Sequence, residues 1–191
     1  MSKIIFAGYL SLDGVMGDPN GSEGTKQGGW LFRHGPDVIA GDPFGISAVL
    51  DTGCLLLGRR SWEFFAKIWP DRDDPFSTKM NAMPKLVVSR SLEHVDGWQN
   101  STVLQGDLVE EARKRKQEQD VVIVGSGSVV RTLMAYDLVD EFRLIVFPMI
   151  LGEGSRLFSD GTAPVDLALV STQTIGPAVR LIYTRKHAGP N

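Results

Sequence analysis

Three short segments of the sequence combine glycine, serine and arginine and contain no carboxylate. They are residues 58–61 (Gly-Arg-Arg-Ser), 89–91 (Ser-Arg-Ser) and 125–128 (Gly-Ser-Gly-Ser). Glycine lets the backbone approach a ligand closely, and free N–H groups at the start of a helix favour an anion. Arginine and hydroxyl groups add charge-assisted hydrogen-bond donors. These residue types predict contacts with phosphate groups.

Each segment directly follows a mostly apolar run that is typical of a buried strand. The runs are 54–57, 85–88 and 121–124. Such runs occur in parallel sheets that are covered on both faces. Ligands of these sheets bind beyond the carboxyl ends of the strands. We therefore expect the three segments to lie along one edge of a sheet and to hold one ligand with several separated phosphates.

The familiar nucleotide-binding signatures do not fit these segments. Val130 stands where the dinucleotide fingerprint that begins at Gly125 requires a third glycine, and no acid follows a strand end about twenty residues later. A Walker A sequence is also missing, which argues against hydrolysis of a nucleoside triphosphate. With arginines after two strands and no acid to bind a ribose, a 2′-phosphorylated dinucleotide is favoured over its unphosphorylated relative.

Strands alternate with helices along most of the chain. Further strands are expected at 3–9, 102–104 and 142–147, and helices are expected from Asp42, over 61–68, from Asp107 and over 129–134. Asp42-Pro43 suits a helix start, because the aspartate accepts free N–H groups and proline fits the first turn. Segments 165–174 and 179–185 pair as a hairpin. This order predicts a mostly parallel sheet with helices on both faces and an antiparallel hairpin at its edge.

Residues 10–36 contain seven glycines and little hydrophobic periodicity. A loop this long in a compact domain is uncommon. Two interpretations stay open, a lid or binding loop over a site and a simple surface insertion.

Length and composition favour one globular domain over residues 1–191. The 20 Lys and Arg against 23 Asp and Glu give a formal charge of −3, which excludes a generally basic surface for nucleic acid. No apolar run reaches the length of a membrane span and no signal-peptide pattern follows Met1, so a cytoplasmic protein is expected. The single cysteine, Cys54, excludes a disulfide within the chain, and His34, His94 and His187 stand alone, so no metal site is predicted.

Five segments resemble the dihydrofolate reductase-like family, and within it the stand-alone proteins similar to the C-terminal reductase domain of bacterial riboflavin biosynthesis. They are residues 11–15, 55–63, 87–90, 124–127 and 148–154. The resemblance implies an eight-stranded, mostly parallel sheet with helices on both faces and a C-terminal antiparallel hairpin. It also implies a small-molecule substrate and a homodimer. A zinc deaminase unit, which often accompanies this reductase, is not expected because the chain lacks Pro-Cys-x-x-Cys.

The resemblance implies that NADPH is the cofactor. The residues expected to bind it are Ala7, Gly58, Arg59, Arg60, Ser61, Ser89, Arg90, Gly125, Ser126, Gly127 and Ser128. Among them, Ser89 and Arg90 would surround the 2′-phosphate, residues 125–128 would cradle the pyrophosphate, and Ala7 would face the nicotinamide carboxamide. Asp13 at the lid edge and Trp30 are expected near the substrate. For Trp30, a packed loop anchor is the equal alternative.

Asp42 is the candidate catalytic acid. Folate-reducing members carry a carboxylate on the first helix, and a gapless count from the Gly58 motif places Asp42 there. The competing interpretation is a helix cap before Pro43. The predicted activity is NADPH-dependent transfer of hydride to a small polar heterocycle that is pterin-like or ribosylaminopyrimidine-like. The alternative is an NADP(H)-binding protein without turnover, such as a redox-responsive regulator.

Overall fold

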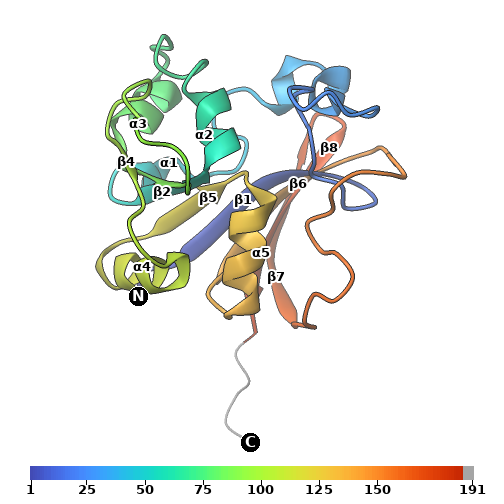
Figure 1. Ribbon diagram of the computed structural model, residues 1–191. Coiled ribbons are helices and arrows are strands. Elements are labelled where there is room, and N and C mark those ends of the chain that lie inside the picture. The colour runs from blue at the N-terminus through green and yellow to red at the C-terminus, as the bar shows by residue number, and fades with distance from the viewer. Residues whose placement is uncertain (187–191) are drawn as a thin grey trace, which may run out of the picture.

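The computed structural model describes residues 1–186, and His187 lies outside the described residues. Eight strands form one sheet in the order β4-β3-β2-β5-β1-β6-β8-β7 (Figure 1). Their bounds are β1 Ile4–Ser11, β2 Cys54–Gly58, β3 Lys85–Val88, β4 Ser101–Val103, β5 Val121–Val124, β6 Glu141–Phe147, β7 Leu167–Ile175 and β8 Ala178–Arg185. The first six strands run parallel, and β8 pairs antiparallel with both β6 and β7. The predicted fold is confirmed.

Helices cover both faces of the sheet (Figure 1). The helices α4 (Leu108–Glu118) and α5 (Gly127–Ala135) pack on one face through Ala112, Val129, Val130 and Leu133. On the other face lie α1 (Ser47–Leu50), α2 (Arg59–Phe65) and α3 (Pro75–Ala82), together with the loop that follows β1. That loop contains two short 3-10 helices, η1 (Trp30–His34) and η2 (Pro36–Val38). Each face therefore has its own apolar core.

Two helices differ from the sequence prediction. The helix expected from Asp42 is short and late, because residues 42–46 form a turn and α1 begins only at Ser47. The helix α3 was not predicted, since its residues show no apolar periodicity. Asp74 nevertheless starts it by accepting the Ser77 N–H at 3.0 Å.

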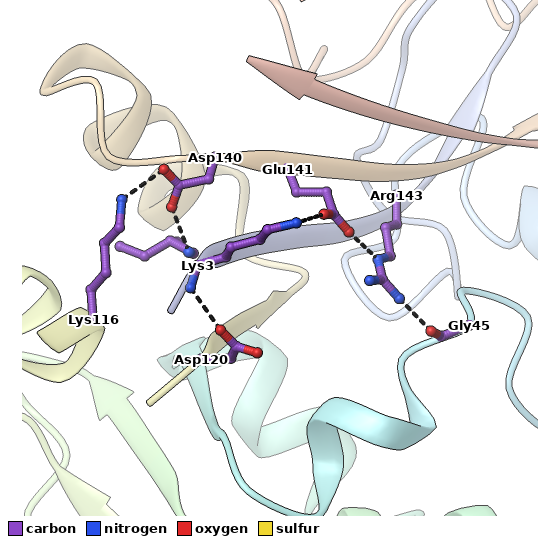
Figure 2. Close-up of polar contacts among 8 residues, drawn as sticks. Lys3, Gly45, Lys116, Asp120, Asp140, Glu141 and Arg143 are labelled. Carbon is purple, nitrogen blue, oxygen red and sulfur yellow. Dashed lines mark hydrogen bonds and ion pairs between the residues drawn. The ribbon is translucent and has the colours of Figure 1, made fainter. Parts of the chain in front are cut away.

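Charged residues fix the amino ends of the central strands (Figure 2). The backbone N–H of Lys3 donates to Asp120 Oδ1 at 2.7 Å, and the N–H of Ile4 donates to Asp140 Oδ2 at 2.8 Å. These bonds join the start of β1 to the residues that precede β5 and β6. The network lies at the end of the sheet opposite to the three phosphate-binding candidates.

Glu141 continues this network towards the loop after β1 (Figure 2). Its carboxylate accepts from Lys3 Nζ at 2.8 Å and from Arg143 Nε at 2.6 Å. Arg143 in turn donates to the carbonyl of Gly45. Glu141 is buried, and the hydrogen bonds from Lys3 and Arg143 outweigh the effect of burial and hold its pKa below the usual range. The strand β6 thereby holds the turn that contains Asp42.

Candidate functional site

The structure brings the three glycine-, serine- and arginine-containing segments together. They follow β3, β2 and β5, which are neighbours in the sheet. Arg59 Nη1 donates to Ser91 Oγ at 2.8 Å and so joins the segments after β2 and β3. A side chain at Gly58 would overlap the Ser126 hydroxyl, so the segments after β2 and β5 are also in contact. We call residues 58–61, 89–91 and 125–128 the rim.

Glycine is required where the rim is most crowded. Gly125 adopts a left-handed conformation with φ of +76°, and a Cβ there would lie 3.1 Å from Ser61 Oγ. Ser126 is also left-handed, with φ of 60°, and its side chain does not cap α5. The first N–H groups of this nine-residue helix therefore have no side-chain cap. An anion at this position would satisfy them and interact favourably with the helix dipole.

The cationic side chains of the rim are exposed and weakly paired. In the part of the chain that the structure describes, the one ion pair of Arg60 is with Glu23, at 3.3 Å, and the two side chains are 76% and 45% exposed. Arg90 is exposed. Ser89 differs, because its hydroxyl oxygen accepts the N–H groups of Ser91 and Leu92 and so shapes the turn itself.

An open stretch of strand edge lies beside the rim. The strand β5 ends at Val124, which pairs with Ala7 of β1, whereas the pairing of β1 with β6 continues as far as Ser11 and Phe147. Among residues 1–186, β1 therefore has no strand partner on the β5 side beyond Ala7, although the Ser11 N–H at its end donates to the Val15 carbonyl at 2.9 Å. Free backbone groups at a strand end suit a planar ligand that carries its own donors and acceptors.

Asp42 caps the turn before α1. Its Oδ1 accepts the Ile46 N–H at 2.8 Å and its Oδ2 accepts the Ser47 N–H at 2.7 Å. The expected helix cap before Pro43 is not formed, because residues 42–46 are a turn and α1 begins at Ser47, and Asp42 stabilises this turn instead. Its role as the catalytic acid stays a prediction. Burial of Tyr9 in β1 raises the pKa of its phenol above the usual range, and the negative charge of Asp42 raises it further.

Two arginines hold the loop that contains Asp42. Arg143 of β6 donates to the Gly45 carbonyl, as described above, and Arg180 Nη1 of β8 donates to the Pro43 carbonyl at 3.2 Å. A Cβ at Gly45 would lie 3.1 Å from Arg180 Nη1, so the loop approaches the arginine closely at a glycine. Neither contact could be predicted from the sequence, because each joins residues about a hundred or more positions apart.

Trp30 is a packed anchor of the loop after β1. Its side chain is fully buried, and its Nε1 donates to the Gly17 carbonyl at 2.9 Å. The ring contacts Phe147 edge-on, with centroids 5.7 Å apart, and Phe147 also contacts Tyr9 and His34. Of the two interpretations of Trp30, this geometry matches the loop anchor.

Asp13 joins two loops instead of lying open to a ligand. Its carboxylate accepts from the Ser11 hydroxyl at 2.7 Å and from the N–H groups of Leu151 and Gly152 at 3.1 and 2.9 Å. Arg156 Nη2 lies 3.4 Å away. The Ser11 hydroxyl and then these N–H groups hold the pKa of Asp13 well below its usual range.

Asp18 is a structural residue that the sequence analysis missed. It is buried, and its carboxylate accepts the N–H groups of Glu23 and Thr25, each at 2.9 Å, and the Thr25 hydroxyl at 2.8 Å. Burial alone would raise the pKa of Asp18, but these hydrogen bonds lower it. A side chain at Gly28 would overlap the Asp18 carboxylate. The Asp-Pro-Asn-Gly sequence was the available signal for this turn.

Neither a membrane-spanning helix nor a metal-binding cluster is present in residues 1–186. Among residues 1–186, no helix combines the length and apolar character needed to cross a bilayer. Within the same part of the chain, no three His, Cys, Asp or Glu side chains are grouped so as to hold a metal ion.

Residues 2–181 match the model of the family described as the RibD C-terminal domain. The uncharacterized protein YyaP of Bacillus subtilis (strain 168) is 31% identical over 189 residues, which cover 95% of this chain and 94% of the relative. A crystal structure from Shewanella sp. PV-4, provisionally named as a riboflavin biosynthesis protein, superposes with a TM-score of 0.74 at 23% identity. The match covers 98% of this chain and 100% of the Shewanella chain. A pyrimidine reductase-like protein from Corynebacterium diphtheriae gives a TM-score of 0.65 at 12% identity, and the match covers 98% of this chain and 93% of the Corynebacterium chain. At these identities the two structures support the fold.

Proposed function

The chain belongs to the RibD C-terminal domain family, and on that premise we propose that it is an NADPH-dependent reductase of a small polar heterocycle. The substrate class is pterin-like or ribosylaminopyrimidine-like. The names of the Shewanella and Corynebacterium proteins, which refer to riboflavin biosynthesis and to pyrimidine reduction, favour the second of these.

The single observation that carries the proposal is the continuity of the rim. The bond from Arg59 to Ser91 and the close approach of Gly58 to Ser126 join three donor-rich turns into one surface. Several phosphates of one extended ligand can then be bound at once. We assign the 2′-phosphate to Ser89, Arg90 and Arg59, and the pyrophosphate to residues 125–128 at the start of α5.

The nicotinamide ring would lie beside Ala7, where β5 has ended and the backbone of β1 has no strand partner on that side. When bound, NADPH supplies the hydride, and the protein holds the ring and the acceptor in line. Backbone groups of β1 would fix the carboxamide, and residues 13–17 would cover it. These residues fit the group because the pairing of β5 with β1 ends at Ala7.

The proton that completes the reduction is assigned to water. Each oxygen of Asp42 accepts one backbone N–H group, so the carboxylate stabilises the turn before α1. A positioned acid contributes typically about 10²- to 10⁴-fold to such a step, so its absence slows the reduction without preventing it.

The alternative, an NADP(H)-binding protein without turnover, shares the rim and differs only in the chemistry. NADPH consumption, measured by its near-ultraviolet absorbance with dihydrofolate and with ribosylaminopyrimidine acceptors, separates the two. Turnover with either acceptor supports the reductase. Saturable NADPH binding without turnover on any acceptor supports the alternative.

Binding itself is tested by thermal denaturation in the presence of NADPH, NADH or ATP, because a ligand that binds the folded state raises the melting temperature by mass action. We expect the largest rise with NADPH. Equal rises with NADPH and NADH would contradict the assignment of the 2′-phosphate. The homodimer and the cytoplasmic location expected from the sequence stay predictions.

A further inference from the structure

Tyr9 lies in the stretch of β1 that extends beyond the end of β5. The strand β5 ends at Val124, which pairs with Ala7, whereas Tyr9 pairs with Ile145 of β6. Successive side chains of a strand alternate between its two faces, so Ala7 and Tyr9 point to the same face, about 7 Å apart along the strand. Ala7 belongs to the apolar core on the side of the loop after β1, and Tyr9 packs against that core. Tyr9 is therefore close to the position proposed for the nicotinamide.

Two aromatic rings fix the ring of Tyr9. The centroid of Phe44, in the turn of residues 42–46, lies 4.7 Å from that of Tyr9, and Phe147 of β6 contacts Tyr9 edge-on at 5.9 Å. Both phenylalanines are buried. A ring that is packed in this way loses little conformational freedom when its hydroxyl binds a ligand.

The hydroxyl of Tyr9 is unpartnered and open. No group of residues 1–186 forms a hydrogen bond with it. In the same part of the chain, the enclosed polar side-chain atoms without a partner are Trp69 Nε1 and Arg180 Nε, so the Tyr9 hydroxyl is reached by solvent. A hydroxyl held on a fixed ring beside the proposed coenzyme site is available to hydrogen-bond a ligand.

Burial and the charge of Asp42 determine which kind of ligand this hydroxyl can bind. Both raise the pKa of the Tyr9 phenol above its usual range, with burial as the larger cause. The phenol therefore stays protonated at neutral pH and can donate a hydrogen bond. A second negative charge beside Asp42 would be unfavourable. A neutral oxygen or nitrogen with a free lone pair meets both conditions.

We infer that the Tyr9 hydroxyl donates a hydrogen bond to the neutral oxygen or nitrogen of the double bond that is reduced in the heterocyclic acceptor. This inference rests on the proposed function and adds the atom by which the acceptor is recognised. Addition of the hydride to carbon moves the electron pair of the double bond to that oxygen or nitrogen, which takes its proton from water, while Tyr9 keeps its own. The hydrogen bond strengthens as the charge develops, so its main effect is on kcat.

The first test observes the phenol of Tyr9 without turnover. The full chain is labelled with carbon-13 at the tyrosine Cζ, whose nuclear magnetic resonance signal senses hydrogen bonding of the hydroxyl. The chain has three tyrosines, and the signal that is absent from Tyr9→Phe belongs to Tyr9. Dihydrofolate or a ribosylaminopyrimidine, added with and without oxidised NADP⁺, should shift the Tyr9 signal and leave that of the exposed Tyr136 in place. A Tyr9 signal that moves with neither acceptor would overturn the inference.

The second test measures the kinetics of Tyr9→Phe, which keeps the packed ring and removes the hydroxyl. We expect kcat to fall about three- to tenfold, the effect of one neutral hydrogen bond. The affinity for NADPH and the melting temperature should stay unchanged, which a merely structural role would not predict. Tyr136→Phe at the end of α5 is the matched control, since it removes an exposed hydroxyl. Equal kcat in the two variants would overturn the inference.

The two tests also separate this inference from the proposed function. If the natural chain and Tyr9→Phe consume NADPH at the same rate, the reductase stands and the role of Tyr9 fails. If no acceptor leads to consumption of NADPH, the reductase fails. A shift of the Tyr9 signal on addition of an acceptor would then still support the hydrogen bond from Tyr9 to the heterocycle.

Discussion

The rim and the loop after β1 both contain charged side chains, but those of the rim are cationic and exposed, whereas three carboxylates of the loop are hydrogen-bonded within the chain. In the rim, Arg60 and Arg90 extend into solvent, and the pair of Arg60 with Glu23 at 3.3 Å is exposed. Exposed pairs of this kind contribute little to stability. In the loop after β1, the carboxylates of Asp13, Asp18 and Asp42 each accept two or more backbone N–H groups.

This difference separates binding groups from structural groups. A side chain whose hydrogen bonds are already made within the chain stabilises a loop, and a ligand gains little by replacing those bonds. A charged side chain left without such partners is available to a ligand. The contrast supports the proposal that the rim binds the coenzyme, and it assigns the three aspartates to the shape of the loop after β1.

The largest expected effect tests whether the exposed arginines of the rim bind the coenzyme. Arg59→Ala and Arg90→Ala should each weaken NADPH by about 1.5–3 kcal/mol, or roughly ten- to hundredfold, because each removes a charge-assisted contact with the 2′-phosphate. The affinity for NADH should stay nearly unchanged. Fluorescence titration with both dinucleotides measures the two effects, with Arg113→Ala as the control of equal charge. Equal losses for NADPH and NADH would show that these arginines do not bind the 2′-phosphate.

The second prediction tests whether the hydrogen bonds of Asp18 stabilise the loop after β1. Asp18→Ala removes three hydrogen bonds and leaves the N–H groups of Glu23 and Thr25 without their acceptor. The free energy of unfolding should fall by about 1–3 kcal/mol, and hydrogen exchange at those two N–H groups should accelerate. Chemical denaturation and exchange measurements check this, with the exposed Asp96→Ala as the control. If Asp18→Ala were as stable as Asp96→Ala, Asp18 would have no structural role.

The third prediction separates the two interpretations of Asp42. Asp42→Ala should lower the free energy of unfolding by about 1 kcal/mol, because two backbone N–H groups lose their acceptor. Asp42→Asn keeps one of the two acceptor oxygens, so it should lose less stability than Asp42→Ala and leave kcat close to that of the natural chain. A fall in kcat of about 10²- to 10⁴-fold in Asp42→Asn, with stability preserved, would make Asp42 the proton donor after all.

The sequence predicted the sheet and the rim because both depend on local patterns. The apolar runs at 54–57 and 121–124 are strands whatever surrounds them, and the residues directly after a parallel strand must lie at its carboxyl edge. The closeness of Gly58 to Ser126 could therefore be predicted without knowledge of distant contacts.

The loop after β1 was less predictable because its contacts are distant in sequence. Asp13 binds Leu151 and Gly152, and Arg180 holds Pro43, so the side chains that fix this loop come from β8 and from the segment after β6. Residue type alone does not distinguish an aspartate that meets such donors from one that meets a substrate. The helix α3 was missed for a related reason, since its capping residue Asp74 stands in a charged run that resembles a solvated turn.

The smallest expected effect concerns acid and Asp13. Hydrogen bonds lower the pKa of Asp13 in the folded chain below the ordinary aspartate value of 3.8. The unfolded chain therefore binds the proton first as the pH falls, and the stability that the carboxylate contributes is complete above the unfolded pKa and is lost below it. Asp13→Asn should be less stable than the natural chain at neutral pH, and the gap should narrow from about pH 4 downwards. Denaturation curves between pH 7 and pH 3 measure this gap, with Asp96→Asn as the control. A gap that stays constant between pH 7 and pH 3 would show that folding does not lower the pKa of Asp13, and that its hydrogen bonds do not favour the ionised carboxylate.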